Sequence, residues 1–301
     1  MGPTRARIPP WFRVRLPEGE RCRSVRSAVA RQNLTTVCEH ARCPNLAECW
    51  GAGTATFLIL GDTCTRGCGF CAVTRGDPGG AIGDETEGAR VAQAARELGL
   101  DYVVVTSVTR DDLPDGGASA FAETVRCLKE LTPSPAVELL VPDYLGGPLE
   151  TVLGAAPDVL AHNLEVVERL TPVLRHGRFR FRRSLEVLSK AKAHVCDGIT
   201  KSSILLGFGE TEGEVEAAMR DLRSAGVEIL VLGQYLQPTQ HHAPVREYLP
   251  PEAFTRLGDK ARELGFGFVA SSPLARTSYR AAEAHVRGRF ARVAGEERCR
   301  G

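Results

Sequence analysis

The sequence has almost no net charge and no long apolar run. Its 301 residues include 38 lysines and arginines against 37 aspartates and glutamates, which gives a formal net charge of +1. Composition therefore offers no argument for a nucleic-acid partner or a charged membrane surface. No apolar stretch approaches the roughly 20 residues that a membrane-spanning helix needs. We therefore expect neither nucleic-acid binding nor a membrane segment.

The first residues also lack the apolar core of a secretory signal peptide. Residues 1–17 read MGPTRARIPPWFRVRLP, a basic stretch without a continuous apolar segment. A secreted disulfide framework is therefore disfavoured, and clustered cysteines in a reducing compartment are more often metal ligands. We expect a cytoplasmic protein in which clustered cysteines bind metal.

Cysteine itself is plentiful, and six of the ten cysteines fall between positions 38 and 71. The first trio has the spacing C-x4-C-x5-C and consists of Cys38, Cys43 and Cys49. The second trio has the spacing C-x3-C-x2-C and consists of Cys64, Cys68 and Cys71. Each trio has one thiolate fewer than the four that usually hold an iron–sulfur cluster. A cluster held by three cysteines keeps one iron open to a substrate or cofactor.

A structural zinc site is the main alternative for these cysteines. Zinc takes four ligands, commonly from C-x2-C pairs, and here only Cys68 and Cys71 form such a pair. The spacing therefore favours iron–sulfur clusters over zinc. The remaining cysteines are scattered along the chain, and Cys127 lies in a helical pattern that suits a small core residue. These scattered cysteines are Cys22, Cys127, Cys196 and Cys299.

Beyond the second trio, strand-like and helix-like segments alternate. The helical segments are amphipathic, as Val91, Ala94, Ala95 and Leu98 show with their i, i+3, i+4, i+7 spacing. The strand candidates are apolar and β-branched, which is typical of strands buried on both faces. Repeated βα units imply right-handed crossovers and a parallel sheet. The predicted strands lie within residues 55–62, 102–108, 136–143, 159–165, 200–210 and 227–238.

Six βα units are too few for a closed eight-stranded barrel. We therefore predict an α/β fold, a partial (β/α)6 TIM-type barrel, with an open doubly wound sheet as the alternative. Residues 54–270 form the barrel in this prediction, and residues 1–53 form an N-terminal extension that carries the first trio. Residues 271–301 are a polar, arginine-rich tail. Neither end segment looks able to fold alone, so we expect both to pack on the barrel.

Polar residues gather toward the carboxyl ends of the predicted strands, where parallel βα barrels carry their active sites. The second trio directly follows the first strand and so belongs to the same end. We expect His162 to be a satisfied buried histidine and His241–His242 to face solvent. Asp111–Asp112 suit either a cofactor edge or a turn. The residues that we expect to contact a cofactor are Thr106, Ser107, Glu138, Asn163 and Gln237.

The second trio, with Phe70 just before its last cysteine on the loop after the first strand, resembles the radical S-adenosylmethionine superfamily. Longer motifs resemble the lipoyl synthase family over almost the whole chain, namely GTATFLILGDTCTRGC, TSVTRDDLPDGG, HNLE, GQYLQP and RTSY. The resemblance implies a 4Fe–4S cluster whose open iron binds S-adenosylmethionine. It also implies insertion of two sulfur atoms at carbons 6 and 8 of an octanoyl chain carried on a lysine of a partner protein. The implied ligands of this cluster are Cys64, Cys68 and Cys71.

The same resemblance implies that the first trio binds a second 4Fe–4S cluster, which is consumed as the sulfur source. In the family, a serine of an Arg-Ser-Ser-Tyr motif near the C-terminus supplies its fourth ligand. Here the motif reads Arg276-Thr277-Ser278-Tyr279, and Ser278 matches the ligand. Thr277 departs from the pattern but keeps a hydroxyl.

The resemblance also implies partners. They are octanoylated lipoyl carrier domains of 2-oxoacid dehydrogenase acyltransferase subunits and of the glycine cleavage H protein, a ferredoxin- or flavodoxin-type reductant, and an iron–sulfur carrier. A passive electron carrier or cluster scaffold is an alternative function, but it needs no barrel with a polar mouth. A biotin-forming radical enzyme is another, and it leaves the first trio unexplained.

Overall fold

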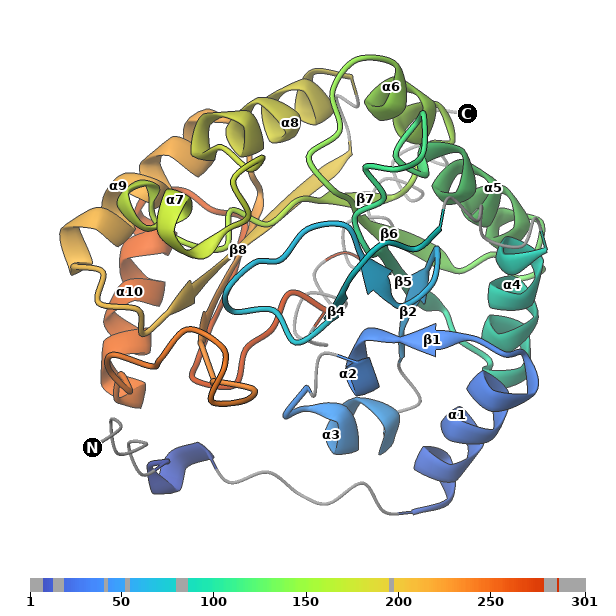
Figure 1. The fold of residues 1–301 in the computed structure, drawn as a ribbon, viewed down its shortest axis with the longest axis horizontal. Helices are drawn as coiled ribbons and strands as arrows, with labels where there is room; N and C mark the ends of the chain where they lie inside the picture. Colours follow the sequence, from blue (N-terminus) through green and yellow to red (C-terminus); the bar gives the residue numbers. More distant parts are fainter. Residues whose placement is uncertain are drawn as a thin grey trace, which may run out of the picture.

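The computed structural model describes residues 8–12, 19–40, 43–51, 55–79, 86–194, 198–278 and 286. Its centre is an eight-stranded sheet in the order β1-β2-β5-β6-β7-β8-β9-β10. Strand β1 (Thr35–Thr36) runs antiparallel to β2, and every other neighbouring pair is parallel. In Figure 1 the main helices lie around the outside of this curved sheet.

The parallel strands follow the chain order without reversal. A doubly wound sheet reverses its strand order at a switch point, so this alternative is wrong and the predicted partial barrel is confirmed. Six strands overlap the predicted segments, and β8 begins one residue before its segment, whereas β10 is a seventh parallel strand that was not predicted. The strands are β2 (Thr56–Ile59), β5 (Tyr102–Ser107), β6 (Ala136–Leu140), β7 (Val159–Ala161), β8 (Ile199–Leu206), β9 (Ile229–Gln234) and β10 (Phe268–Ser271).

One main helix connects each consecutive pair of parallel strands, as right-handed βα units require. The periodic apolar positions are the buried ones, for example Val91, Ala94 and Ala95 in α4. Short elements in the connections are β3 (Thr63–Cys64), β4 (Thr74–Arg75), η2 (Glu168–Leu170) and α7 (Thr171–Leu174). The main helices are α4 (Glu87–Leu98), α5 (Ala118–Lys129), α6 (Gly147–Gly154), α8 (Phe181–His194), α9 (Glu212–Ser224) and α10 (Pro251–Glu263).

Side chains alternate along each strand between the helix layer and the barrel interior. In β5, Val103 and Val105 join the cluster that packs against α4 and α5. Tyr102 and Val104 instead join a separate cluster with Ile199 of β8 and residues of other strands. This inner cluster fills the amino-terminal end of the barrel, and it leaves the carboxyl ends of the strands free to form a site.

The N-terminal segment lies along one edge of the barrel. It contains η1 (Pro10–Phe12), α1 (Glu20–Arg31), β1, α2 (Val37–His40) and α3 (Leu46–Gly51). Helix α1 packs against α3 and α4, and the indole of Trp50 is fully buried. No helix within the described ranges has the length and apolarity to cross a membrane.

Candidate active site

A cavity of about 380 Å³ lies at the carboxyl ends of the strands. Its wall includes Thr106 and Ser107 of β5, Leu140 of β6, and Ser203 of β8. It is also lined by five of the six clustered cysteines and by the serine of the tail, which are Cys38, Cys43, Cys64, Cys68, Cys71 and Ser278. The fold thus brings three segments that are distant in sequence to one space.

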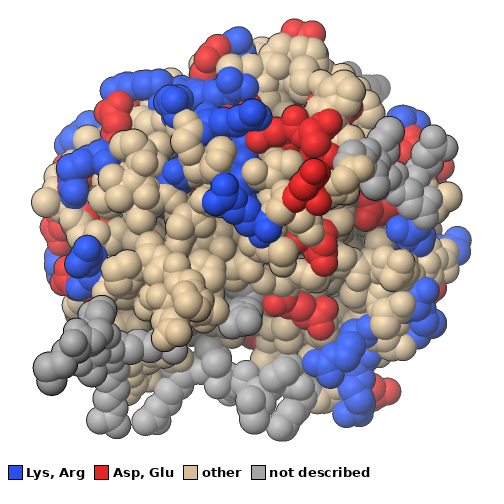
Figure 2. Space-filling view, in the orientation of Figure 1, with Lys and Arg blue, Asp and Glu red and all other residues tan. Residues whose placement is uncertain are grey.

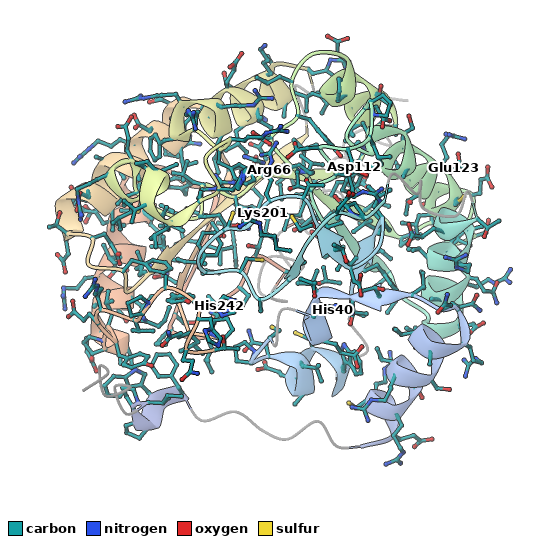
Figure 3. The ribbon with its side chains drawn as sticks, in the orientation of Figure 1. His40, Arg66, Asp112, Glu123, Lys201 and His242 are labelled. Atoms are coloured by element: carbon teal, nitrogen blue, oxygen red, sulfur yellow. The ribbon has the colours of Figure 1, made fainter. Side chains whose placement is uncertain are left out.

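The loop of the second trio is held by backbone contacts on two sides. Gly69 N–H donates to Leu174 O at 2.7 Å, and Ala243 N–H donates to Gly69 O at 2.7 Å. His242 is also part of this support, because its Nε2 lies 3.0 Å from Cys71 O. The expectation that His242 faces solvent is therefore wrong, although His241 is exposed. Figure 3 labels His242 beside this loop.

Two sulfur atoms of this trio accept hydrogen bonds from the backbone. Arg66 N–H donates to Cys64 Sγ at 3.4 Å, and His176 N–H donates to Cys68 Sγ at 3.4 Å. Hydrogen bonds to ligand sulfurs are among the features that set the potential of iron–sulfur clusters. The loop is therefore suited to thiolates that carry charge.

Arg66, between Cys64 and Cys68, anchors the loop to the barrel. Its guanidinium forms ion pairs of 2.7 Å with Asp111 and 2.7 Å with Asp143, and its central carbon lies 4.3 Å from the ring centroid of Phe179. Hydrogen bonding with Arg66 lowers the pKa of Asp111. Asp111 is thus neither a simple turn residue nor a carboxylate that is free to contact a cofactor. Figure 2 shows acidic and basic side chains adjoining on this face.

The first trio lies in the N-terminal segment. Cys38 belongs to α2 and Cys49 to α3, while Cys43 N–H donates to Cys38 O at 3.1 Å. Cys49 is buried but is not among the residues that line the cavity. This trio therefore meets the cavity through Cys38 and Cys43.

Burial controls the protonation of these thiols. It raises the pKa of Cys38 to about 11 and that of Cys71 to about 12, and it raises the pKa of Cys43 and Cys68 as well. Such thiols are not nucleophiles near neutral pH, because the nucleophile is the thiolate. A bound metal supplies the positive charge that stabilises thiolates. The donor sets therefore fit metal centres.

Among the described residues, no three His, Cys, Asp or Glu side chains are placed to hold one metal ion.

Three of the five predicted cofactor-contacting residues line the cavity, namely Thr106, Ser107 and Asn163. Thr106 Oγ1 donates to Leu140 O at 2.8 Å. Ser107 Oγ is buried and has no hydrogen-bond partner within the described part of the chain. An unpaired buried hydroxyl is costly, so Ser107 fits a site that a polar ligand completes.

The other two, Glu138 and Gln237, do not line the cavity. Glu138 is fully buried in a deeper layer, where its carboxylate accepts hydrogen bonds from Lys201 Nζ at 2.8 and 2.9 Å and from the Tyr102 hydroxyl. Lys201 is labelled within the barrel in Figure 3. Gln237 Nε2 donates to His242 O at 2.9 Å. Neither side chain therefore contributes to the wall of this cavity, and their contact with a cofactor stays a prediction.

His162 is a satisfied buried histidine, as predicted. Its Nδ1 lies 2.9 Å from Val141 O, and its Nε2 lies 2.9 Å from Ser184 Oγ. Burial lowers its pKa to about 4, so the ring is neutral near neutral pH. The two ring nitrogens therefore link the end of β7 to the end of β6 and to α8.

Polar residues without a role predicted from the sequence also line the cavity, among them Glu165, Arg175 and Ser203. Glu165 has a φ of 70°, which is rare for a side chain other than glycine and is typical of functional positions. Burial raises the pKa of Glu165 and lowers that of Arg175. The polar position of Glu165 after a strand was the only signal available in the sequence.

The tail reaches the cavity from the far end of the chain. Leu274 O accepts a hydrogen bond of 2.6 Å from Asn45 Nδ2. Asn45 lies in the sequence between the last two cysteines of the first trio. The hydroxyl of Thr277 lies 2.9 Å from Ser203 Oγ and 3.0 Å from Asn163 Nδ2. The next residue, Ser278, lines the cavity. The tail therefore folds back over the barrel mouth, whereas Tyr279 lies outside the described residues.

Comparison with protein-family models matches residues 58–222 to the radical SAM superfamily. Residues 2–43 match the N-terminal domain of lipoyl synthase of the same superfamily. Solved structures at low sequence identity share the fold. Streptococcus suis SuiB bound to S-adenosylmethionine has a TM-score of 0.57 and 12% identity, covering 76% of this chain and 54% of that one. Methylornithine synthase (PylB) has a TM-score of 0.52 and 16% identity, covering 84% and 79%.

Curated relatives match nearly the full length. Lipoyl synthase of Anaeromyxobacter dehalogenans is 53% identical over 285 residues, which are 94% of this chain and 96% of that protein. Lipoyl synthase of Thermus thermophilus is 53% identical over 275 residues, 91% of this chain and 85% of that protein. Mitochondrial lipoyl synthase of Branchiostoma floridae is 47% identical over 293 residues, 95% of this chain and 78% of that protein. The chain therefore belongs to the lipoyl synthase family of sulfur-inserting enzymes in the radical SAM superfamily.

Proposed function

We propose that the two trios hold two different 4Fe–4S clusters on facing walls of one cavity. The second trio would hold the cluster that membership of the radical SAM superfamily implies, together with S-adenosylmethionine. The first trio and Ser278 would hold a second cluster that is consumed as the sulfur source. The observation that carries this proposal is the shared cavity, which five of the six cysteines and Ser278 line.

When bound, the cofactor supplies a carbon-centred radical that removes hydrogen from unactivated C–H bonds, which no side chain can do. The protein positions the groups and excludes water. Leu58, Phe70, Val108 and Leu205 give the cavity an apolar wall suited to an octanoyl chain. Thr106 and Ser107 line the cavity as well, and we place the cofactor beside them.

Ser278 has chemistry that suits a temporary ligand. A serine oxygen is harder than a thiolate and matches a thiolate-rich iron cluster less well. A fourth ligand of this kind would be held less tightly than cysteine, as a cluster that gives up sulfur requires. Within the described part of the chain Ser278 makes no hydrogen bond of its own, so its side chain is available.

We infer an octanoyl chain on a lysine of a lipoyl carrier protein as the substrate, with sulfur inserted at carbons 6 and 8. The carriers that we propose are 2-oxoacid dehydrogenase acyltransferase subunits and the glycine cleavage H protein. A ferredoxin- or flavodoxin-type reductant, an iron–sulfur carrier and a location in the cytoplasm complete the proposal. Family membership excludes the passive electron carrier and the biotin-forming enzyme as alternatives.

Iron and sulfide per chain after anaerobic reconstitution test the two-cluster proposal. We expect about eight irons in the wild type and about four when all three cysteines of the first trio are replaced by alanine. That triple variant should still form 5′-deoxyadenosine from S-adenosylmethionine but no lipoyl product, whereas Cys64→Ala should form neither. About four irons in the wild type, or lipoyl product from the triple variant, would refute the assignment.

A further inference from the structure

Thr277 is the residue at which this chain departs from the Arg-Ser-Ser-Tyr motif, and its hydroxyl bridges β8 and the segment that follows β7. It accepts a hydrogen bond of 3.0 Å from Asn163 Nδ2, just beyond β7. It lies 2.9 Å from Ser203 Oγ in β8, to which it can donate. One hydroxyl of the tail thus joins two adjacent strands of the barrel at the cavity wall.

The tail before Thr277 is fixed by other contacts. Ser272 N–H donates to Leu232 O at 3.1 Å, and Gln234 N–H donates to Pro273 O at 3.2 Å, so this stretch continues along β9. The packing is close, because a Cβ at Gly233 would lie 2.1 Å from Ala275 O. Together with the Asn45–Leu274 bond, these contacts fix the tail as far as Ala275.

Beyond Ala275 the hydrogen bonds between the tail and the barrel become few. The Arg276 guanidinium bonds only to carbonyls of the tail itself, Ala275 O at 2.7 Å and Pro273 O at 3.5 Å, among the described residues. Ser278 makes no hydrogen bond in the described part of the chain. Thr277 is therefore the last described side chain that ties the tail to the barrel before Ser278 enters the cavity.

We propose that Thr277 is a positioning residue whose hydroxyl latches the tail to Asn163 and Ser203 and so places Ser278 between the two trios. The inference rests on the proposed role of Ser278 as a cluster ligand. Asn163 and Ser203 line the same cavity, so the latch connects the tail to the wall where the cofactor is expected. Loss of the hydroxyl should release Ser278 without disturbing the second trio.

Tryptic cleavage of the Arg276–Thr277 bond in cluster-free protein tests the latch alone. Cleavage requires the tail to leave the barrel, and the amount of the fragment ending at Arg276 can be followed by intact mass. Two neutral hydrogen bonds should make release of the tail from the barrel on the order of 10- to 30-fold rarer than it is without them. Thr277→Val keeps the shape and removes the hydroxyl, so its cleavage should be faster by that factor. Thr277→Ser restores the family's residue and should cleave at the wild-type rate.

Ser272→Ala is the matched control, because Ser272 is also a tail hydroxyl but makes no side-chain hydrogen bond among the described residues. It should cleave as the wild type does. In reconstituted enzyme, Thr277→Val should raise the ratio of 5′-deoxyadenosine to lipoyl product, and Thr277→Ser should leave it unchanged. Circular dichroism confirms that each variant is folded, and Thr277→Ala replaces Thr277→Val if the latter is not.

Two results would overturn the latch. One is wild-type cleavage in Thr277→Val, and the other is equally fast cleavage in Thr277→Ser, which would point to the methyl group instead. Ser278→Ala separates this inference from the proposed function. If Ser278→Ala retains full sulfur insertion, the ligand role of Ser278 is wrong, and so is the latch's purpose of placing it. If Ser278→Ala loses insertion and Thr277→Val behaves as the wild type throughout, only the latch is wrong.

Discussion

Replacing Arg66 by methionine should destabilise the protein by removing the anchor of the second trio's loop. The guanidinium makes a two-pronged contact with Asp111 through Nε at 2.8 Å and Nη2 at 2.7 Å, and a third contact with Asp143 at 2.7 Å. It also stacks on Phe179. Methionine keeps most of the apolar stem and removes all three charge-assisted hydrogen bonds. The variant thus isolates the polar anchor.

The size of the loss follows from what remains around the two carboxylates. Leaving a buried charge without its partner costs about 3–5 kcal/mol. Asp143 keeps Arg183 at 3.1 Å, and Asp111 keeps the exposed Arg178 at 3.3 Å. This partial compensation reduces the expected loss of unfolding free energy to about 2–4 kcal/mol. Arg66→Lys keeps a charge but not the planar fork, so it should lose about half as much.

Thermal unfolding of cluster-free protein, followed by circular dichroism, measures this loss. For a chain of this size roughly 2 °C corresponds to 1 kcal/mol, so Arg66→Met should lower Tm by about 4–8 °C. The matched control is Arg182→Met, which breaks an exposed ion pair with Glu168 at 3.2 Å and should change Tm by less than about 2 °C.

The same substitution should weaken cluster binding by the second trio. In a background that lacks the first trio, reconstituted iron comes from the second trio alone, and Arg66→Met should reduce it below about four irons per chain. An Arg66→Met variant with wild-type Tm and undiminished iron would show that the loop does not depend on this anchor.

Three further predictions concern other parts of the site. Ser278→Cys should assemble full iron content yet insert sulfur poorly, because a thiolate is a better-held ligand; normal lipoyl product would contradict the ligand role. Burial holds the pKa of His162 near 4, against about 6.5 in the unfolded chain. The ring is neutral in both states above pH 6.5. As the pH falls toward 4, the unfolded chain binds a proton there before the folded protein does, so the free energy of unfolding decreases by about 3 kcal/mol. Urea unfolding of wild type and His162→Gln should differ in this pH dependence, and identical profiles would refute it. Lys201→Met leaves the Glu138 carboxylate buried without its cation and should cost about 3–5 kcal/mol in urea unfolding, whereas adding Glu138→Leu should recover part of the loss; additive losses would contradict the pairing.

The fold was largely predictable because strand burial leaves a clear mark in this sequence. Strands β5 and β9 are covered on both faces, so nearly every residue in them is buried and each begins with a continuous apolar run. Strand β10 was missed because it has only four residues, all half-buried, at the edge of the sheet. An edge strand needs no such run, so periodicity carries little signal there.

The site was predictable to the depth that spacing and strand position allow. Cysteine spacing indicated two metal centres, and strand ends indicated the mouth. Glu138 lies two residues before Leu140 on the same interior face, yet Leu140 lines the cavity and Glu138 belongs to the layer below. The sequence indicates which face of the sheet a strand residue lies on, but not how far below the cavity it lies. Gln237 follows the end of β9, where the loop and not the strand decides its direction.

The position of Ser278 shows why a single cavity matters for the proposed chemistry. A carbon that loses hydrogen at one wall and gains sulfur at the other has to lie within reach of both trios. Parallel strands place their carboxyl ends together, so the loop of Cys64, the extension of Cys43 and the tail converge there. The hydroxyl of Thr277 links the tail to Asn163 and Ser203 of the barrel. The residue that departs from the family motif is therefore the one through which the proposed latch would place the proposed fourth ligand.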